Sequence, residues 1–463
     1  MRLFIMNKHR KMKKIEFRRL ALVAALAVLA AQATAQEARP QERRWTLGEC
    51  IEYARSNNIQ VRKAQINASA GEVELEAAKA SRYPTLSFNS GQSVSHQSAI
   101  KLINDYGEVV SDGTFSYGGS YGFGSNVSIF QGGRLRNNVR RQEKQLESSR
   151  MAVEQSENTI TVNVAQAYLQ ILYARETAEI NRRAVELAAR QVDRAQKRLE
   201  EGDAARNEAA QMRSQLAAAQ YDLTAAQNNL AQYTLQLKQL LELGADDRFE
   251  AAYPEIGDEE VLQALPTVAE VYAAAVEIMP ETRSAEVMIE ASQYAEKVAK
   301  AGFYPSISLS ANVSTGHQSG TPVSMGSQLR DKLNESVGLS LSVPIFNNKS
   351  ARTSVRRARL DTRQSEIDNL NARKELLATV ESLHHDAVAG QANFVSAGEK
   401  LLYAEESWRL AEASFEAGAN NAVDLITEKN NYLSALSARL QAKYQAVLAA
   451  KILLFYKGEP ITL

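Results

Sequence analysis

Residues 336–346 read Ser-Val-Gly-Leu-Ser-Leu-Ser-Val-Pro-Ile-Phe, and this stretch is the strongest indicator of the fold. From residue 336 to residue 343 every second side chain is apolar, and the side chains between are serine or glycine. Because successive side chains of a strand point to opposite faces, the pattern predicts a strand with one apolar face and one small, polar face. Strands of about 9–11 residues with this alternation are typical of membrane β-barrels, although β-sandwich strands alternate in the same way.

Similar stretches occur elsewhere, so strands are expected at about 84–95, 116–130, 305–314 and 335–346. In a barrel, their apolar side chains would face lipid and their polar side chains a lumen. Four strands cannot close a barrel, because the smallest membrane barrels have about eight. Open strand edges are not tolerated in lipid, so a barrel would require two, three or four copies of the chain. The residues expected to face lipid are Tyr121, Phe123, Val127, Ile129, Leu309, Leu339, Leu341 and Val343.

The chain contains an internal repeat. Residues 46–85 align without a gap with 267–306, and Ile129-Phe130 aligns with Ile345-Phe346. We therefore expect two tandem copies that each contain a helix, a β-hairpin, a very long helix, a tight turn and a return helix. The expected boundaries are 45–244 and 266–457 for the copies, 245–265 for an acidic linker and 458–463 for a tail.

The long helices are expected at 134–201 and 350–417. No proline occurs between Pro84 and Pro254 or between Pro344 and Pro460, and proline breaks helix interiors. About 67 residues at 1.5 Å each form a rod of roughly 100 Å, which needs partner rods along its length. The helices alone are also compatible with a secreted coiled-coil filament, but the alternating strands argue against it.

The N-terminus predicts a secretory signal peptide over 1–35. A basic region is followed by the apolar run 20–31 and then by small residues at 33–35, as at a signal-peptidase site. The apolar run is shorter than the roughly 20 residues of a membrane span, which argues against a retained anchor helix. Translation could begin at Met1 or Met12. The single cysteine, Cys50, excludes an intramolecular disulfide and is expected to pack within a helix.

The order of these elements resembles the TolC-like outer-membrane efflux protein family. The motifs that carry the resemblance are Tyr83-Pro84 and Tyr304-Pro305 before strands, Ile-Phe-Gln-Gly-Gly-Arg at 129–134, Pro-Ile-Phe-Asn-Asn at 344–348, and the glycine turns at 199–202 and 415–418. The resemblance implies a mainly α-helical chain with a transmembrane β-barrel, built as a trimer with twelve strands in the outer membrane and a twelve-helix α-barrel in the periplasm. It also implies a periplasmic adaptor and an inner-membrane transporter as partners, for which the channel is a passive exit duct.

The same resemblance implies a periplasmic aperture at the two glycine turns, Gly202 and Gly418. Glu208 and Asp424 each follow their glycine by six residues. Rings of carboxylates at a narrow opening favour cations. An acid in the first turn of a helix is also favoured by the helix dipole, so a purely structural role stays open. Some relatives lock the aperture with an arginine near the second turn, where this chain has Asn420; Arg206 in the first turn is the alternative candidate.

Composition and motifs argue against other functions. The formal net charge is +0, which does not suggest a nucleic-acid partner. No metal-ligand spacing, nucleophile motif or phosphate loop occurs, so no enzyme activity, catalytic residue, metal or cofactor is expected. His96 and His317 are expected in loops after their strands. The main rival is a periplasmic adaptor, which usually has one helical hairpin, whereas this chain duplicates both hairpin and strands.

Overall fold

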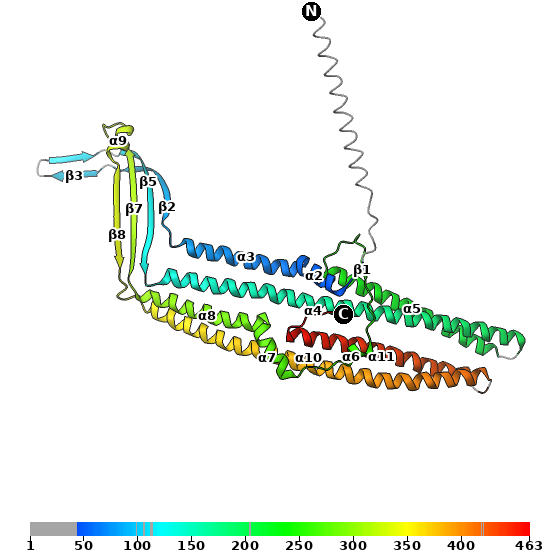
Figure 1. The fold of residues 1–463 in the computed structure, drawn as a ribbon. Helices are drawn as coiled ribbons and strands as arrows, with labels where there is room; N and C mark the ends of the chain where they lie inside the picture. Colours follow the sequence, from blue (N-terminus) through cyan, green and yellow to red (C-terminus); the bar gives the residue numbers. More distant parts are fainter. Residues whose placement is uncertain are drawn as a thin grey trace, which may run out of the picture.

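The computed structural model describes residues 44–463 except 99, 105–106, 112–113, 203–204, 418 and 420, with backbone only over 99–114. Long helices run side by side, and a sheet of long strands stands at one end of them (Figure 1). The signal peptide expected at 1–35 lies outside the described residues. No helix in the described part of the chain has the length and apolarity of a transmembrane helix. The prediction of a mainly helical chain is confirmed.

The described part of the chain contains eight main helices. They are α2 (Leu47–Asn57), α3 (Ile59–Ala80), α4 (Arg134–Glu201), α5 (Arg206–Leu240), α7 (Val268–Ile278), α8 (Pro280–Lys300), α10 (Ser350–Glu416) and α11 (Ala422–Lys457). A continuous helix was expected at the start of each copy, but the chain forms two helices at both places. Asn58 is extended and caps α3 through its side chain, and Pro280 begins α8, where its missing N–H leaves no hydrogen bond unmade.

Four long strands form one antiparallel sheet in the order β2-β5-β7-β8. Their bounds are β2 Thr85–Gln97, β5 Thr114–Gln131, β7 Ser306–Gln318 and β8 Asn334–Ser342. Strand β8 ends before Pro344, which has no N–H for a sheet ladder, so Val343 lies just outside it. The sequence did not predict the hairpin of β3 (Ile100–Asn104) and β4 (Gly107–Ser111) or the short helix α9 (Met325–Asp331). Between α8 and β7, η1 (Ala301–Phe303) forms a single 3₁₀ turn.

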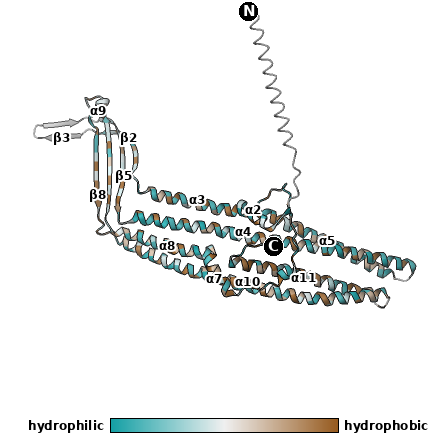
Figure 2. Ribbon diagram, in the orientation of Figure 1, coloured by the Kyte–Doolittle hydropathy of each residue, from teal (hydrophilic) through white to brown (hydrophobic). Residues whose placement is uncertain are grey.

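The register gives the sheet one apolar and one polar face. Val127, Leu309 and Leu339 lie opposite one another on β5, β7 and β8, and Phe88 lies opposite Phe123. Side chains of strictly alternating positions share a face, so these apolar residues cover one side of the sheet. Hydrophobic and hydrophilic residues accordingly alternate along the strands (Figure 2). The opposite face carries serine, glycine and asparagine, including Ser87, Gly124, Asn126, Ser308, Ser310, Asn312, Gly338 and Ser340.

A β-bulge interrupts this regularity near the end of β5. Ser128 is paired with Ser308, and Phe130 with Ile307, so Ile129 has no partner on β7. After the bulge, Phe130 takes the place opposite Ile307 on the apolar face. Ile129, expected on that face from simple alternation, is the extra residue of the bulge and is exposed.

The helices lie side by side in one layer. The half of the layer near the sheet and the half away from it contain different sets of helices. Towards the sheet the order is α3-α4-α8-α10, and away from it the order is α5-α4-α11-α10. The largest buried cluster lies between these halves and includes Cys50, Tyr168 and Tyr444, which confirms the packed position expected for the cysteine. Helix α10 forms one lateral edge of the layer, and α3 and α5 form the other.

Gly390 sets the distance between α10 and α11. A Cβ at this position would lie 2.9 Å from Ala446 Cα, so the two helices would have to separate. We therefore expect Gly390→Ala to destabilise the protein by about 1–3 kcal/mol, although Gly→Ala normally stabilises helix interiors by about 1 kcal/mol.

Gly398→Ala on the same helix is the matched control, because its Cβ would meet only Arg439 Nε at 3.9 Å. Denaturant unfolding followed by circular dichroism should give opposite signs for the two variants. A higher unfolding midpoint for Gly390→Ala would show that the helices accommodate the methyl group.

Candidate functional site: helix tips and belt

The two hairpins turn at the end of the layer farthest from the sheet (Figure 1). Gly202 ends α4 with φ 86°, and its N–H donates to the carbonyl oxygens of Arg198 and Leu199. This left-handed conformation explains the glycine at the first turn. Gly418 and Asn420, in the second turn, lie outside the described residues.

The two acids predicted at the aperture both lie in the first turn of a return helix. Glu208 in α5 accepts a hydrogen bond from Arg198 Nη1 at 3.1 Å. The backbone N–H of Asp424 in α11 donates to Asn421 Oδ1 at 2.9 Å. Among the described residues, no interaction joins the Glu208 and Asp424 side chains.

The charged side chains that contact the second hairpin near the tip belong to α4; among the described residues, Arg206 forms no such contact. Arg194 forms an ion pair with Glu416 of α10. The Arg198 guanidinium lies 5.6 Å from the centroid of the Phe415 ring. These side chains line a cavity of about 600 Å³ between the tips. The sequence analysis missed Arg194 and Arg198; their spacing of four residues near the end of α4 was the available signal.

An apolar cluster joins the hairpins beside these charges. Ala195 of α4, Met212 of α5 and Leu425 of α11 are buried together, with Phe415 packed against them. The tip therefore has a small shared core, and the arginine contacts lie around it.

Midway along the helices, the linker crosses the layer as a belt. Strand β6 (Glu250–Ala251) pairs with β1 (Arg44–Trp45), and Tyr168 Oη of α4 lies 2.5 Å from Ala252 O and 3.1 Å from Trp45 O. Beyond α6 (Asp258–Val261), Gln391 Nε2 of α10 donates to Val261 O and Gln263 O. The belt therefore ties α4 to α10.

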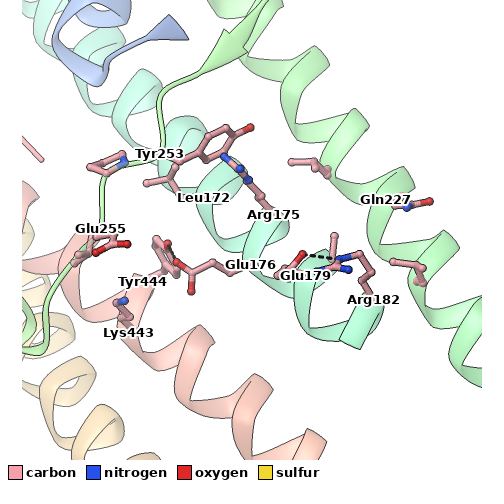
Figure 3. Close-up of a pocket in the computed structure, with 15 residues that line it drawn as sticks. Leu172, Arg175, Glu176, Glu179, Arg182, Gln227, Tyr253, Glu255, Lys443 and Tyr444 are labelled. Atoms are coloured by element: carbon pink, nitrogen blue, oxygen red, sulfur yellow. Dashed lines mark hydrogen bonds and ion pairs between the residues drawn. The ribbon is translucent and has the colours of Figure 1, made fainter. Parts of the chain in front are cut away.

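The belt also covers a cavity of about 620 Å³ between α4, α5 and α11 (Figure 3). Tyr444 donates its hydroxyl hydrogen to Glu176 Oε1 at 2.5 Å, which joins α11 to α4. The Arg175 guanidinium lies 3.3 Å from the centroid of the Tyr253 ring. The charges on its wall are balanced, with Arg175, Arg182 and Lys443 against Glu176, Glu179 and Glu255.

A buried thiol and two buried tyrosine hydroxyls in this region have a raised pKa, which predicts that the protein is less stable at alkaline pH. Burial raises the pKa of Cys50 to about 12 and also raises the pKa of Tyr168 and Tyr444. In the unfolded chain these groups release protons near pH 8.5 and 10, so above about pH 9 the folded state binds more protons than the unfolded state. The free energy of unfolding should therefore fall between about pH 9 and 12.

Chemical unfolding at several pH values between about 8 and 11 measures this slope. Tyr168→Phe removes one of the groups, so it should lower stability at pH 8 by about 1 kcal/mol, through loss of a hydrogen bond, and flatten the alkaline slope. An unchanged slope in Tyr168→Phe would show that the tyrosine titrates similarly in both states.

Two of the histidines lie in the sheet. His96 and His317 were expected in loops, but they lie within β2 and β7 because these strands extend farther than predicted. The His317 ring is buried and lies against Tyr117 and Tyr121. Within the described residues, no group of three or more His, Cys, Asp or Glu side chains could hold a metal ion.

The family model for outer membrane efflux proteins matches residues 50–242 and 271–459, and the chain belongs to this family. Family membership assigns it to the outer membrane. Similar solved structures include the CmeC outer membrane channel of Campylobacter jejuni, with 18% identity, a TM-score of 0.73, and coverage of 90% of this chain and 87% of that chain. The open state of the Neisseria gonorrhoeae MtrE outer membrane channel is 19% identical, with a TM-score of 0.72 and coverage of 90% and 89%.

The outer membrane protein VceC of Vibrio cholerae is 17% identical, with a TM-score of 0.72 and coverage of 90% and 96%. No curated protein matches the chain significantly. At these identities, the solved structures show a shared fold. The family predicted from the sequence is confirmed.

Proposed function

We propose that the protein is the outer-membrane exit duct of a tripartite efflux or type I export system. It passively conducts substrates that an inner-membrane transporter delivers through a periplasmic adaptor. The observation that carries this proposal is the four-stranded sheet, whose apolar face is largely exposed. In the described part of the chain, its outer strands β2 and β8 each pair with one strand only. An exposed apolar sheet face suits lipid, and edges in lipid need partners from other copies.

The helices also have unpartnered lateral edges. On α3, Ile59, Ile66 and Val73 are exposed at seven-residue intervals. On α10, at the opposite edge of the layer, two runs of exposed apolar residues have the same interval: Leu360 and Ile367, and then Val388, Val395 and Leu402. Seven-residue apolar spacing is the pattern of helices that pack side by side. Copies of the chain would cover both edges by placing α10 of one beside α3 and α5 of the next.

Three copies would give a barrel of twelve strands and, away from the membrane, a tube of twelve helices. The two tandem copies 45–244 and 266–457 would alternate around this trimer, with the linker 245–265 as a belt in the periplasm. The adaptor would contact the helical tube. A signal peptide at 1–35 would direct export.

Oligomer mass and single-channel conductance of the purified mature protein test this proposal. A trimer in detergent that forms long-lived channels in planar bilayers is the expected result. A monomer that neither inserts nor conducts would contradict the duct and favour a soluble periplasmic adaptor.

The tip acids give a prediction for ion selectivity. We expect Asp424→Asn to lower the preference of the channel for cations, because three copies would remove three carboxylates from one narrow opening. Reversal potentials in a salt gradient measure the preference.

The double variant Glu208→Gln and Asp424→Asn should lower the preference further. Glu405→Gln on α10 is the control, because this acid lies more than ten residues before the second turn. Unchanged selectivity in the double variant would exclude the two acids from the aperture.

A further inference from the structure

Lys429 lies within α11 with its side chain buried between the two hairpins. Its side chain is 3% exposed, and no hydrogen bond or ion pair joins it to another described residue. Burial lowers the pKa of Lys429, and no neighbouring carboxylate counteracts this effect. A buried ammonium group without a negative partner destabilises the packing that surrounds it.

The helix pattern places this lysine on the face of α11 that meets α4. Ala422, Leu425 and Ile426 precede it on the same buried stripe. Leu425 shares the tip cluster with Ala195 of α4, and Tyr432 shares a cavity with Arg183 of α4. We call the contact between the two hairpins the seam. Lys429 lies along the seam between Leu425 and Tyr432.

The seam is held at both ends. Near the tip, Arg194 pairs with Glu416. At the belt, Tyr444 donates to Glu176, and Arg439 of α11 pairs with Asp258 at 2.7 Å. Between these levels, no described side-chain hydrogen bond or ion pair crosses from α4 to the second hairpin.

Next to the tip cavity and the tip cluster, the seam contains two donors without acceptors. Gln191 Nε2 and Trp408 Nε1 are buried without a hydrogen-bond partner. Gln191 belongs to α4 and Trp408 to α10, so both hairpins contribute. Buried donors without partners lower the stability of the packed state.

We propose that Lys429 is a positioning residue that weakens the closed seam, so that the helix tips separate at a lower energetic cost. Separation would hydrate the ammonium group, and Lys429 therefore favours the separated state. The belt contacts hold the end of the seam that lies away from the tips. Separation of the hairpins is therefore confined to the part between the belt and the tips. This inference rests on the proposed duct, in which separated tips are the open state.

The variant Lys429→Met tests the inference, because it keeps the length of the side chain and removes the charge. The open fraction in planar bilayers should fall on the order of tenfold or more, and the denaturant midpoint should rise. Lys400→Met, on the exposed face of α10, is the matched control and should change neither quantity.

An open fraction equal to that of the parent, or a lower denaturant midpoint in Lys429→Met, would overturn the inference. Should this variant fail to form oligomers, Lys429→Gln carries the same test with a neutral polar side chain. A parent protein that does not conduct contradicts the proposed function itself. A conducting parent with an unaffected Lys429→Met variant contradicts only the role of the lysine.

Discussion

Leu309→Lys is expected to abolish membrane insertion of the protein, whereas Ser310→Lys, one residue along the same strand, should insert and conduct. Leu309 lies on the apolar face of β7, opposite Val127 and Leu339, and Ser310 lies on the polar face. A lysine facing lipid near the bilayer midplane costs about 2–4 kcal/mol per copy, and three copies would share one barrel. In the lumen, the same lysine stays hydrated.

Heat-modifiable trimers in outer-membrane fractions measure insertion of the two variants. Ser310→Lys has a second expected effect, because three cations in the lumen should shift ion selectivity towards anions. Equal insertion of both variants would contradict the assignment of the apolar face to lipid.

Periodic features of this fold could be predicted from the sequence. Alternation at period two predicted the strands, because one sheet face is mostly apolar and the other is small and polar, most regularly along β8. Local exceptions were missed. The bulge at Ile129 changes the alternation without any change in residue type, since Ile129 and Phe130 are both apolar. Strand β8 was predicted too long because alternation continues through Val343, although Pro344 cannot join the ladder.

The paired left-handed residues at the strand-to-helix junctions show a similar limit. Gly132 and Gly133 have positive φ, as expected for glycine, but so do Asn348 and Lys349 at the equivalent junction of the second copy. The sequence alignment of 129–133 with 345–349 relates these positions, whereas residue type alone would not predict Lys349 in this conformation.

Contacts between distant segments could not be predicted from the sequence. Arg194 and Glu416 are separated by 222 positions, and each lies in a helix rich in other charges. In such a sequence, Lys429 resembles the many solvated lysines and arginines of these helices. Its burial depends on the contact between α11 and α4, two segments far apart in the sequence.

The double variant Arg194→Ala and Arg198→Ala is expected to open the tip. It removes the ion pair between α4 and α10, the contact of Arg198 with Phe415, and the bond from Arg198 to Glu208. Exposed ion pairs contribute about 0.2–1 kcal/mol each. A trimer would contain three copies of each contact around one aperture, so their joint loss amounts to about 3 kcal/mol, or roughly 100-fold in the equilibrium between closed and open states. Single-channel recordings should show a large rise in the open fraction.

Lys197→Ala separates this effect from the loss of positive charge at the tip. Lys197 lies between the two arginines in sequence, and its Nζ pairs with Asp193 Oδ2 of the same helix at 2.7 Å. The substitution therefore removes a cation from α4 without removing a contact between the hairpins, and its open fraction should match that of the parent. If Lys197→Ala opens the channel as much as the arginine variant, the charge of the tip controls opening. If neither variant opens it, the apolar cluster around Leu425 holds the hairpins together, and Leu425→Ala should then raise the open fraction, because it removes most of a side chain from the core that the hairpins share.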